Sequence, residues 1–386
     1  MPRQLPFAAP SGNGSVGWKG DIRWEYYFFP IFAEKFDYPR SRRGVGPTRR
    51  GRRRRGDRMK RRDFMGAICG AALMSPSVAH AQQPGKVWRI GHVLVNPPER
   101  GGAIRVQALE KGLADLGDVQ GRNIELLHRF PGPQPEKLQE VISSLLPQID
   151  LLVVWGTVGG VAAKRVASGV PTVFLSVGAP VEIGLVQSLA HPGGNMTGIT
   201  FEAAAGTYGK RLQILKEIVP DLKRAAVLRA VGDPNVGFAM TSLEQAAPEL
   251  GVSLVSVDIK SADDLESAFA KIKNSDVGAV LEIAGALTFN LGAETADHAL
   301  GAHLPLCSAF RETVMAGGLV SLGPDFAAMI RQAAAQIDKI IKGAKPADIP
   351  VEQPTRYDLY INLKTARLLN LTMPPSLLAR ADEVIE

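Results

Sequence analysis

The chain of 386 residues has a formal net charge of +7, and 45% of its residues are hydrophobic, enough to build a sizeable core. The basic charge is concentrated at the start, because residues 1–81 hold 17 of the 45 Lys and Arg but 6 of the 38 Asp and Glu. Residues 82–386 therefore carry a net charge of −4, which argues against a nucleic acid as their partner. This remainder is long enough for two domains of ordinary size.

Residues 59–81 have the three parts of a secretory signal peptide. Lys60, Arg61 and Arg62 form a positive start, residues 64–74 form an apolar run, and Ala79-His80-Ala81 forms a small-x-small cleavage site. The apolar run is shorter than the roughly 20 residues that a membrane span requires. We therefore expect export to the periplasm, and the paired arginines also resemble a twin-arginine signal. The alternative is a buried core helix with a basic flank.

Residues 1–58 contain an arginine run at 52–55 and an aromatic cluster at 24–29, without sustained helical or strand periodicity. A signal peptide has to lie near the start of a protein to be read as one. We therefore interpret residues 1–58 as a non-native, disordered extension that precedes a true start at Met59. The alternative is a basic arm that binds nucleic acid or anionic lipid.

From residue 87 onward, apolar β-branched runs alternate with segments of helical periodicity. The expected strands are 87–95, 123–130, 149–156, 171–178, 224–231, 252–259, 276–285 and 304–310. The expected helices are 101–117, 134–148, 158–169, 180–190, 203–220, 237–251, 261–274, 289–302 and 325–343. Continuous apolar strands separated by helices indicate parallel sheets covered on both faces. The pattern restarts after the Gly- and Asn-rich stretch 191–200, so the predicted fold class is α/β with two doubly wound parallel-sheet lobes.

The sequence of residues 82–386 carries no motif for catalysis or metal binding. Its histidines lack metal-ligand spacing, and it has no G-x-S-x-G or P-loop motif. Residues 153–160 superficially resemble a dinucleotide-binding turn, but they lack the G-x-G-x-x-G spacing. Cys307 lies in an apolar strand and is interpreted as a buried small hydrophobe rather than a nucleophile. We therefore expect no catalytic residues, no cofactor and no metal ion.

Glycines and small polar residues follow many of the expected strands. Their backbone N–H groups and short side chains can bind a carboxylate or similar anion, and ligands of such sheets bind at the carboxyl ends of the strands. The predicted ligand-binding residues are Asn96, Thr157, Ser176, Gly178, Asn195, Thr197, Arg229, Asp233, Asn235, Ala284, Gly285, Ser308 and Phe310. As a set they suit a small polar solute that is held by hydrogen bonds, with no catalytic base.

Four segments resemble ABC-transporter substrate-binding proteins of the type I periplasmic binding fold, and within them the subfamily that includes tryptophan- and tyrosine-binding members. These segments are 184–200 (GLVQSLAHPGGNMTGIT), 209–228, 310–326 and 337–386. The resemblance covers residues 86–386 and implies a three-segment hinge with crossings near 199–204, 315–319 and 345–350. It also implies an N-terminal lobe of residues 86–200 plus 318–346 and a C-terminal lobe of residues 201–317 plus 347–386.

The resemblance implies a monomer whose cleft closes on a small solute, such as an amino acid or a related compound, and delivers it to an inner-membrane permease. Two cleft positions depart from the family pattern: Arg229-Ala230 replaces Asn-Pro, and Ala284-Gly285-Ala286 replaces an acidic or aromatic residue. Arg229 either binds a ligand carboxylate or faces solvent. We predict a periplasmic solute-binding protein for uptake. The alternatives are a sensory binding protein for a membrane receptor and an exported α/β enzyme.

Overall fold

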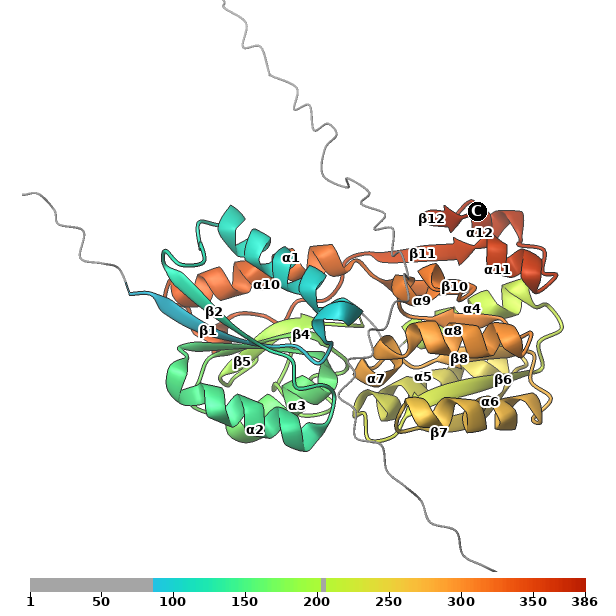
Figure 1. Ribbon diagram of the computed structural model, residues 1–386, viewed down its shortest axis with the longest axis horizontal. Helices are drawn as coiled ribbons and strands as arrows, with labels where there is room; N and C mark the ends of the chain where they lie inside the picture. Colours follow the sequence, from blue (N-terminus) through green and yellow to red (C-terminus); the bar gives the residue numbers. More distant parts are fainter. Residues whose placement is uncertain (1–85, 203–205) are drawn as a thin grey trace, which may run out of the picture. The chain divides into compact units, whose positions relative to one another are not determined.

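The computed structural model describes residues 86–202 and 206–386, which form two lobes (Figure 1). The predicted extension at 1–58 and the predicted signal peptide at 59–81 lie outside the described residues. Across the described ranges, every helix is too short or too polar to span a membrane.

The first lobe contains a sheet of five parallel strands in the order β2-β1-β3-β4-β5. The strands are β1 (Trp88–Val93), β2 (Ile124–Arg129), β3 (Leu151–Trp155), β4 (Thr172–Val177) and β5 (Met196–Thr200). Helices α1 (Gly102–Asp115) and α10 (Phe326–Ile341) pack on one face, and α2 (Pro135–Leu145) and α3 (Gly156–Val166) pack on the other. Three short 3-10 helices, η1 (Pro98–Arg100), η2 (Leu146–Gln148) and η4 (Pro346–Asp348), complete the lobe. Because both faces are covered, β3 is buried throughout.

The second lobe contains a seven-stranded sheet in the order β12-β11-β10-β9-β8-β6-β7, in which only the β10–β11 pair is antiparallel. The strands are β6 (Arg224–Ala230), β7 (Ser253–Ile259), β8 (Ala279–Glu282), β9 (Leu306–Ser308), β10 (Val320–Pro324), β11 (Tyr357–Asn362) and β12 (Glu383–Ile385). One face packs against α4 (Thr207–Ile218), α5 (Asn235–Glu249), α11 (Leu363–Leu368) and α12 (Pro375–Leu378). The other packs against α6 (Leu265–Lys273), which follows η3 (Ala262–Asp264), and against α8 (Gly292–Gly301). Two short helices, α7 (Ala286–Asn290) and α9 (Arg311–Met315), follow β8 and β9.

The two sheets share one strand order, since β7-β6-β8-β9-β10 repeats β2-β1-β3-β4-β5. The predicted fold class, two doubly wound α/β lobes, is confirmed. In this order the chain reverses its direction of winding between β1 and β3, and again between β6 and β8. Crevices at the carboxyl ends of such strands are where doubly wound sheets bind ligands.

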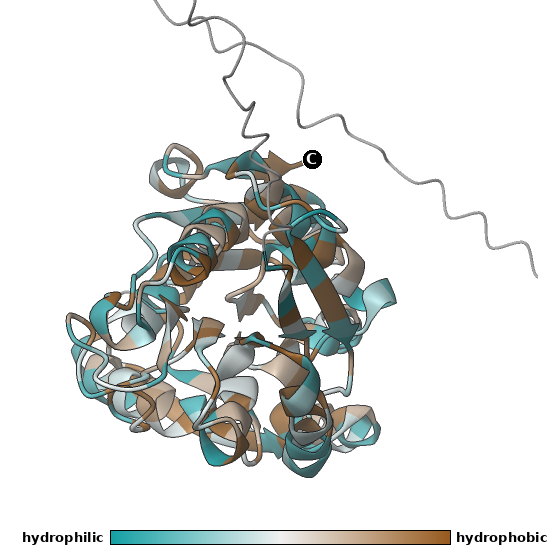
Figure 2. Ribbon diagram, turned by 90° about the vertical axis from the view of Figure 1, so that its left-hand side faces the viewer, coloured by the Kyte–Doolittle hydropathy of each residue, from teal (hydrophilic) through white to brown (hydrophobic). Residues whose placement is uncertain are grey.

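The helices follow the amphipathic pattern that the sequence indicates. Figure 2 shows hydrophobic and hydrophilic residues interleaved along the helices, as expected for helices with one buried side. In α10, Ile330, Ala333 and Ile337 are buried in the hydrophobic core of the first lobe. The Asp325 carboxylate caps this helix by accepting hydrogen bonds from the backbone N–H groups of Ala327 (2.9 Å) and residue 328 (3.1 Å).

Two predicted elements are wrong. Residues 180–190 form turns rather than a helix, because Gly184 adopts a left-handed conformation (φ 69°) that interrupts helical winding. Strand β5 lies within the stretch 191–200 that was predicted as a break between the lobes. It becomes a strand because it pairs with β4 on one side and bridges to Glu352 through Ile199 on the other.

Two of the three predicted hinge crossings lie too early in the chain. The second falls between β10 and α10, because Val320–Pro324 pairs with β9 and β11 and so belongs to the second sheet rather than the first. The third lies between Glu352 and β11, because the N–H groups of residues 351 and 352 donate to the carbonyls of Leu189 and Gly198 in the first lobe. The first predicted crossing, near 199–204, runs into residues 203–205, which lie outside the described ranges; β5 ends at Thr200 before it and α4 begins at Thr207 after it.

Candidate functional site

A cavity of about 40 Å³ lies at the carboxyl ends of strands from both sheets. Eight of the thirteen predicted ligand-binding residues line it, namely Asn96, Thr157, Ser176, Gly178, Asn235, Ala284, Gly285 and Phe310. Six of them follow β1, β3, β6, β8 and β9 or begin the helices after them, and Ser176 and Gly178 lie at the end of β4. The strand order brings these residues together, as expected for a doubly wound sheet.

The first lobe presents a polar wall. The backbone N–H of Gly178 donates to the Thr157 hydroxyl over 3.0 Å, which fixes the loop after β4 against the start of α3. Ser176, near the end of β4, has φ 59°, a left-handed conformation that is uncommon for a residue other than glycine. Strain of this kind tends to occur at functional sites, where the surrounding structure holds it in place.

The second lobe meets this wall at Asn235. The Asn235 amide donates to the Tyr208 hydroxyl and to the carbonyl of Ala284, each over 2.9 Å, so its orientation is fixed. Its Oδ1 atom lies against Gly178 of the first lobe, where a Cβ atom would come within 2.1 Å of it. The two lobes can therefore approach this closely only because residue 178 is a glycine.

Two further contacts join the lobes beside the cavity. The Asn96 amide donates to the Asn290 side-chain oxygen over 2.7 Å. Arg100 forms an ion pair with Glu294 at 2.8 Å and also donates to the backbone carbonyl of Asn290. These contacts hold the two cavity walls together.

Arg105 is a cavity residue that the sequence analysis missed. It lies on α1, is 8% exposed, and its guanidinium carbon lies 4.1 Å from the ring centre of Phe289, 4.9 Å from that of Phe326 and 5.1 Å from that of Trp155. It donates one hydrogen bond to the Asn96 side-chain oxygen. Burial lowers the pKa of Arg105 to about 10, so it remains a cation at neutral pH. Among the described residues, no carboxylate forms an ion pair with Arg105, and the more distant charge of Glu312 opposes the lowering of its pKa only in part.

Aromatic side chains complete the cavity. The Phe310 ring centre lies 5.0 Å from that of Phe289 and 5.7 Å from that of Phe201, and Phe201 lies 6.1 Å from Phe326. These rings come from the first crossing, from α7, from the segment between β9 and α9, and from α10, so distant parts of the chain supply one cluster of aromatic rings. Only Phe310 was predicted, because periodicity assigns single aromatic residues to a core and gives no sign that they converge on a cavity.

Two predicted residues of the first lobe lie away from the cavity and stabilise loops. The Asn195 amide donates to the carbonyls of Ala167 and Val170, each over 2.7 Å. The Thr197 hydroxyl donates to the carbonyl of Ile349 over 2.7 Å. Asn195 directly precedes β5 and Thr197 is the second residue of the strand, so neither lies at the carboxyl end, where the cavity is.

Two predicted residues of the second lobe also lie outside the cavity lining. Arg229 forms an ion pair with Asp258 of β7 at 2.7 Å and is partly exposed, which matches the second of the two alternatives that the sequence left open for it. Asp233 accepts a hydrogen bond from the N–H of Asn235 over 2.9 Å and packs against Gly285. Burial raises the pKa of Asp233 to about 6. Asp233 therefore shapes the loop that presents Asn235.

Ser308, the fifth predicted residue outside the cavity lining, lies in the core of the second lobe. Its hydroxyl donates to the Glu282 carboxyl over 2.8 Å, and Glu282 is fully buried, with a second oxygen that has no hydrogen-bond partner among the described residues. Burial raises the pKa of Glu282 to about 8. Glu282 therefore holds a proton in the folded protein at pH 7.

We expect Glu282→Gln to stabilise the protein at pH 8 and above. Between about pH 4.5 and 8 the unfolded chain releases the Glu282 proton while the folded chain keeps it, so stability falls as pH rises, by about 1.4 kcal/mol per pH unit. Glutamine stays neutral and keeps an acceptor for Ser308. Urea unfolding at pH 5, 7 and 9 should show an advantage of the variant that grows with pH. A constant difference would contradict the assignment.

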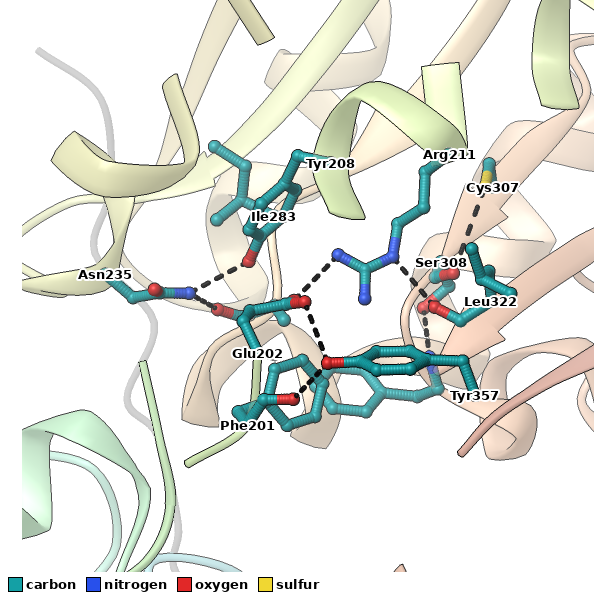
Figure 3. A network of polar contacts seen from close by, with 12 residues as sticks. Phe201, Glu202, Tyr208, Arg211, Asn235, Ile283, Cys307, Ser308, Leu322 and Tyr357 are labelled. Carbon is teal, nitrogen blue, oxygen red and sulfur yellow. Dashed lines mark hydrogen bonds and ion pairs between the residues drawn. The ribbon is translucent and has the colours of Figure 1, made fainter. Parts of the chain in front are cut away.

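A buried network connects the cavity to the hinge (Figure 3). Arg211 of α4 pairs with Glu202 of the first crossing at 2.9 Å and donates to the carbonyl of Leu322, near the second crossing, over 2.8 Å. The Tyr357 hydroxyl, at the end of the third crossing, donates to the carbonyl of Phe201 over 3.1 Å. The Tyr208 hydroxyl accepts the hydrogen bond from the Asn235 amide. Tyr208 lies on the same helix as Arg211, and the guanidinium carbon of Arg211 lies 4.6 Å from the centre of the Tyr208 ring.

Two lobes of parallel sheet, three crossings and a cavity where the lobes meet define a two-lobed ligand-binding protein. The family model for ABC transporter substrate binding proteins matches residues 98–385, so the chain belongs to that family. This confirms the family resemblance found in the sequence. Membership also confirms that the protein is a binding protein rather than an enzyme, and it implies a small-molecule ligand and a transporter permease as partners.

Several known proteins are similar to this chain. A "Tyrosine-binding protein" of Clostridioides difficile is 24% identical over 68% of this chain and 75% of its own length. The crystal structure of a conserved domain protein from Vibrio cholerae is 26% identical, with a TM-score of 0.73, and covers 78% of this chain and 100% of its own. An ABC domain from Streptococcus pneumonia in complex with L-Trp is 22% identical, with a TM-score of 0.72, and covers 77% of this chain and 99% of its own.

Proposed function

We propose that this protein is the periplasmic solute-binding component of an ABC import system, and that its two lobes close on a carboxylate-bearing solute with an aromatic or apolar group. The observation that carries this proposal is Arg105, a buried cation surrounded by aromatic rings at the cavity. Burying a charge is costly, the charge of Glu312 offsets that cost only in part, and a ligand carboxylate would offset more of it. The aromatic rings offer an apolar surface for the rest of the solute.

The relatives support an aromatic amino acid as the first solute class to test. One is named for tyrosine binding, and another was crystallised with L-Trp. The cavity of about 40 Å³ holds a few water molecules, at roughly 10–15 Å³ each, and is small for such a solute. We infer that the lobes separate to admit the solute and close on it, which requires that the solute favour the closed state by its contacts with both lobes.

A thermal-shift experiment on the purified protein tests the ligand class. L-Tryptophan, L-tyrosine and L-phenylalanine should stabilise the protein, by about 2.7 kcal/mol at one hundred times the dissociation constant. L-Tryptophanamide, which has the same ring and amine without the carboxylate, is the matched control and should give a much smaller shift. Equal shifts for acid and amide would contradict the role of Arg105, and a response to sugars alone would overturn the solute class.

Gly178→Ala should weaken solute binding by about tenfold or more without a comparable loss of stability. The added methyl group would lie 2.1 Å from Asn235 Oδ1, and relieving such overpacking costs about 1–3 kcal/mol. This cost falls on the closed state, because the contact joins the lobes. Gly169→Ala is the control, since Gly169 has open space around it. Titration calorimetry measures the solute affinity of both variants. An unchanged affinity in Gly178→Ala would show that binding does not bring residue 178 and Asn235 together.

A further inference from the structure

A line of hydrogen bonds runs from the cavity to the surface of the first lobe. The indole Nε1 of Trp155, a cavity residue, lies 2.8 Å from Nε2 of His92. The Nδ1 atom of His92 lies 2.9 Å from Nδ1 of His128. The Nε2 atom of His128 lies 3.3 Å from a carboxylate oxygen of Glu110. This row of hydrogen bonds therefore passes from β3 to β1, then to β2 and finally to α1.

The chemistry of these groups fixes the direction of each bond. An indole N–H can only donate, so Nε2 of His92 has to be a bare acceptor. A neutral His92 then carries its proton on Nδ1 and donates it to His128, whose Nδ1 has to be bare as well. A neutral His128 therefore carries its proton on Nε2, where it faces the Glu110 carboxylate. Each group donates to the next, and this assignment satisfies every contact in the chain.

We propose that His92 and His128 are positioning residues for the cavity, which hold Trp155 through a chain that forms only when both imidazoles are neutral, so that acidification releases Trp155 and weakens solute binding. A proton added to His128 places N–H groups on both facing Nδ1 atoms unless His92 changes tautomer. If His92 changes tautomer, its Nε2–H faces the indole N–H instead. One bond of the chain is lost in either case.

The surroundings make the neutral forms the stable ones. His92 is fully buried, and its burial, with His128 beside it, lowers its pKa well below the usual value. Burial also lowers the pKa of His128, against the opposing effect of Glu110, and Arg129 on the same strand lowers it further. Arg105 lies beyond the indole ring. On the α10 side, the residues packed into this core are apolar, Ile330 among them.

The position of Trp155 makes this chain relevant to binding. Its ring lines the cavity, and the guanidinium of Arg105 lies over it. If the indole loses its anchor, the fraction of molecules with a formed binding surface falls, and the apparent affinity falls with that fraction. The effect on solute affinity rests on the proposed function, whereas the hydrogen-bond chain itself does not.

Nitrogen-15 NMR of the solute-free full-length protein tests the chain directly. At pH 8, His92 should be the Nδ1–H tautomer and His128 the Nε2–H tautomer, and the Trp155 indole resonance should shift as His128 titrates on lowering the pH. Trp155→Phe identifies that resonance. An Nε2–H tautomer of His92, or an indole resonance that does not respond to His128, would overturn the proposal whether or not any solute binds.

Calorimetric titration with L-tryptophan as the probe, from pH 8 to 5, tests the effect on binding. Affinity should fall by about tenfold for each pH unit below the pKa of His128. His128→Gln, which cannot titrate, should remove this dependence, and His191→Gln, at an exposed histidine, should keep it. A pH dependence that persists in His128→Gln would refute the proposal. If L-tryptophan binds at no pH, the proposal about the solute fails. The NMR experiment still shows whether the hydrogen-bond chain from Trp155 to His128 exists.

Discussion

Replacing Arg211 by methionine should lower the free energy of unfolding by about 3–5 kcal/mol, because the substitution leaves the Glu202 carboxylate buried without its partner. Both side chains of this pair are almost completely shielded, with exposed fractions of 0% and 1%. The variant also loses the hydrogen bond from Arg211 to the carbonyl of Leu322 and the contact of the guanidinium with the Tyr208 ring.

Urea unfolding at pH 7 measures this loss, and Arg380→Met is the matched control. Arg380 also pairs with a glutamate, Glu217, but its side chain is 53% exposed, so its removal should cost about 1 kcal/mol or less. A double variant in which Glu202→Leu accompanies Arg211→Met should recover part of the loss, because no buried charge remains. A cost below 1 kcal/mol for Arg211→Met alone would contradict the role given to this pair.

Replacing Arg105 by methionine should reduce the affinity for a carboxylate-bearing solute by about a hundredfold. Charge-assisted hydrogen bonds to a carboxylate contribute about 1.5–3 kcal/mol each, and a guanidinium can form two of them with one carboxylate. Methionine keeps much of the apolar bulk among Trp155, Phe289 and Phe326, so the cluster of aromatic rings should persist. Calorimetry with L-tryptophan and L-tryptophanamide should show that the variant no longer distinguishes them.

Arg229→Met is the control for this experiment. The sequence left open whether Arg229 binds a ligand carboxylate or faces solvent, and the structure pairs it with Asp258 outside the cavity lining. Its replacement should leave the affinity for L-tryptophan within about twofold. A large loss in Arg229→Met together with a small loss in Arg105→Met would reverse the assignment of the two arginines.

The prediction of the fold succeeded where local patterns are strong. Continuous apolar strands such as Leu151–Trp155 alternate with amphipathic helices, and that alternation specifies parallel sheets. The prediction failed where tertiary pairing overrides local composition. Met196–Thr200 contains a glycine and lies within the Gly- and Asn-rich stretch 191–200, yet it is a buried strand because β4 offers it an edge.

For the candidate site as well, the sequence indicated some of the cavity residues and gave no sign of others. Asn96, Thr157 and Asn235 follow strands, and the rule that ligands bind at the carboxyl ends of strands finds them. Arg105 and Phe289 lie on helices with ordinary periodicity, so the sequence gives no reason to separate them from surface or core residues. The same limit applies to His92 and His128, which are 36 residues apart and carry no metal-ligand spacing.

By itself, the sequence determined the two-lobed α/β fold, the family and the polar residues at the strand ends, because each depends on patterns within a short stretch of chain. The tertiary structure decided which strands pair at the hinge, which arginine meets the cavity and how Trp155 is anchored. These features depend on contacts between residues far apart in the chain, such as Arg211 with Leu322 and Asn96 with Asn290. Local periodicity carries no information about such contacts, since they arise only when the packed sheets bring the segments together.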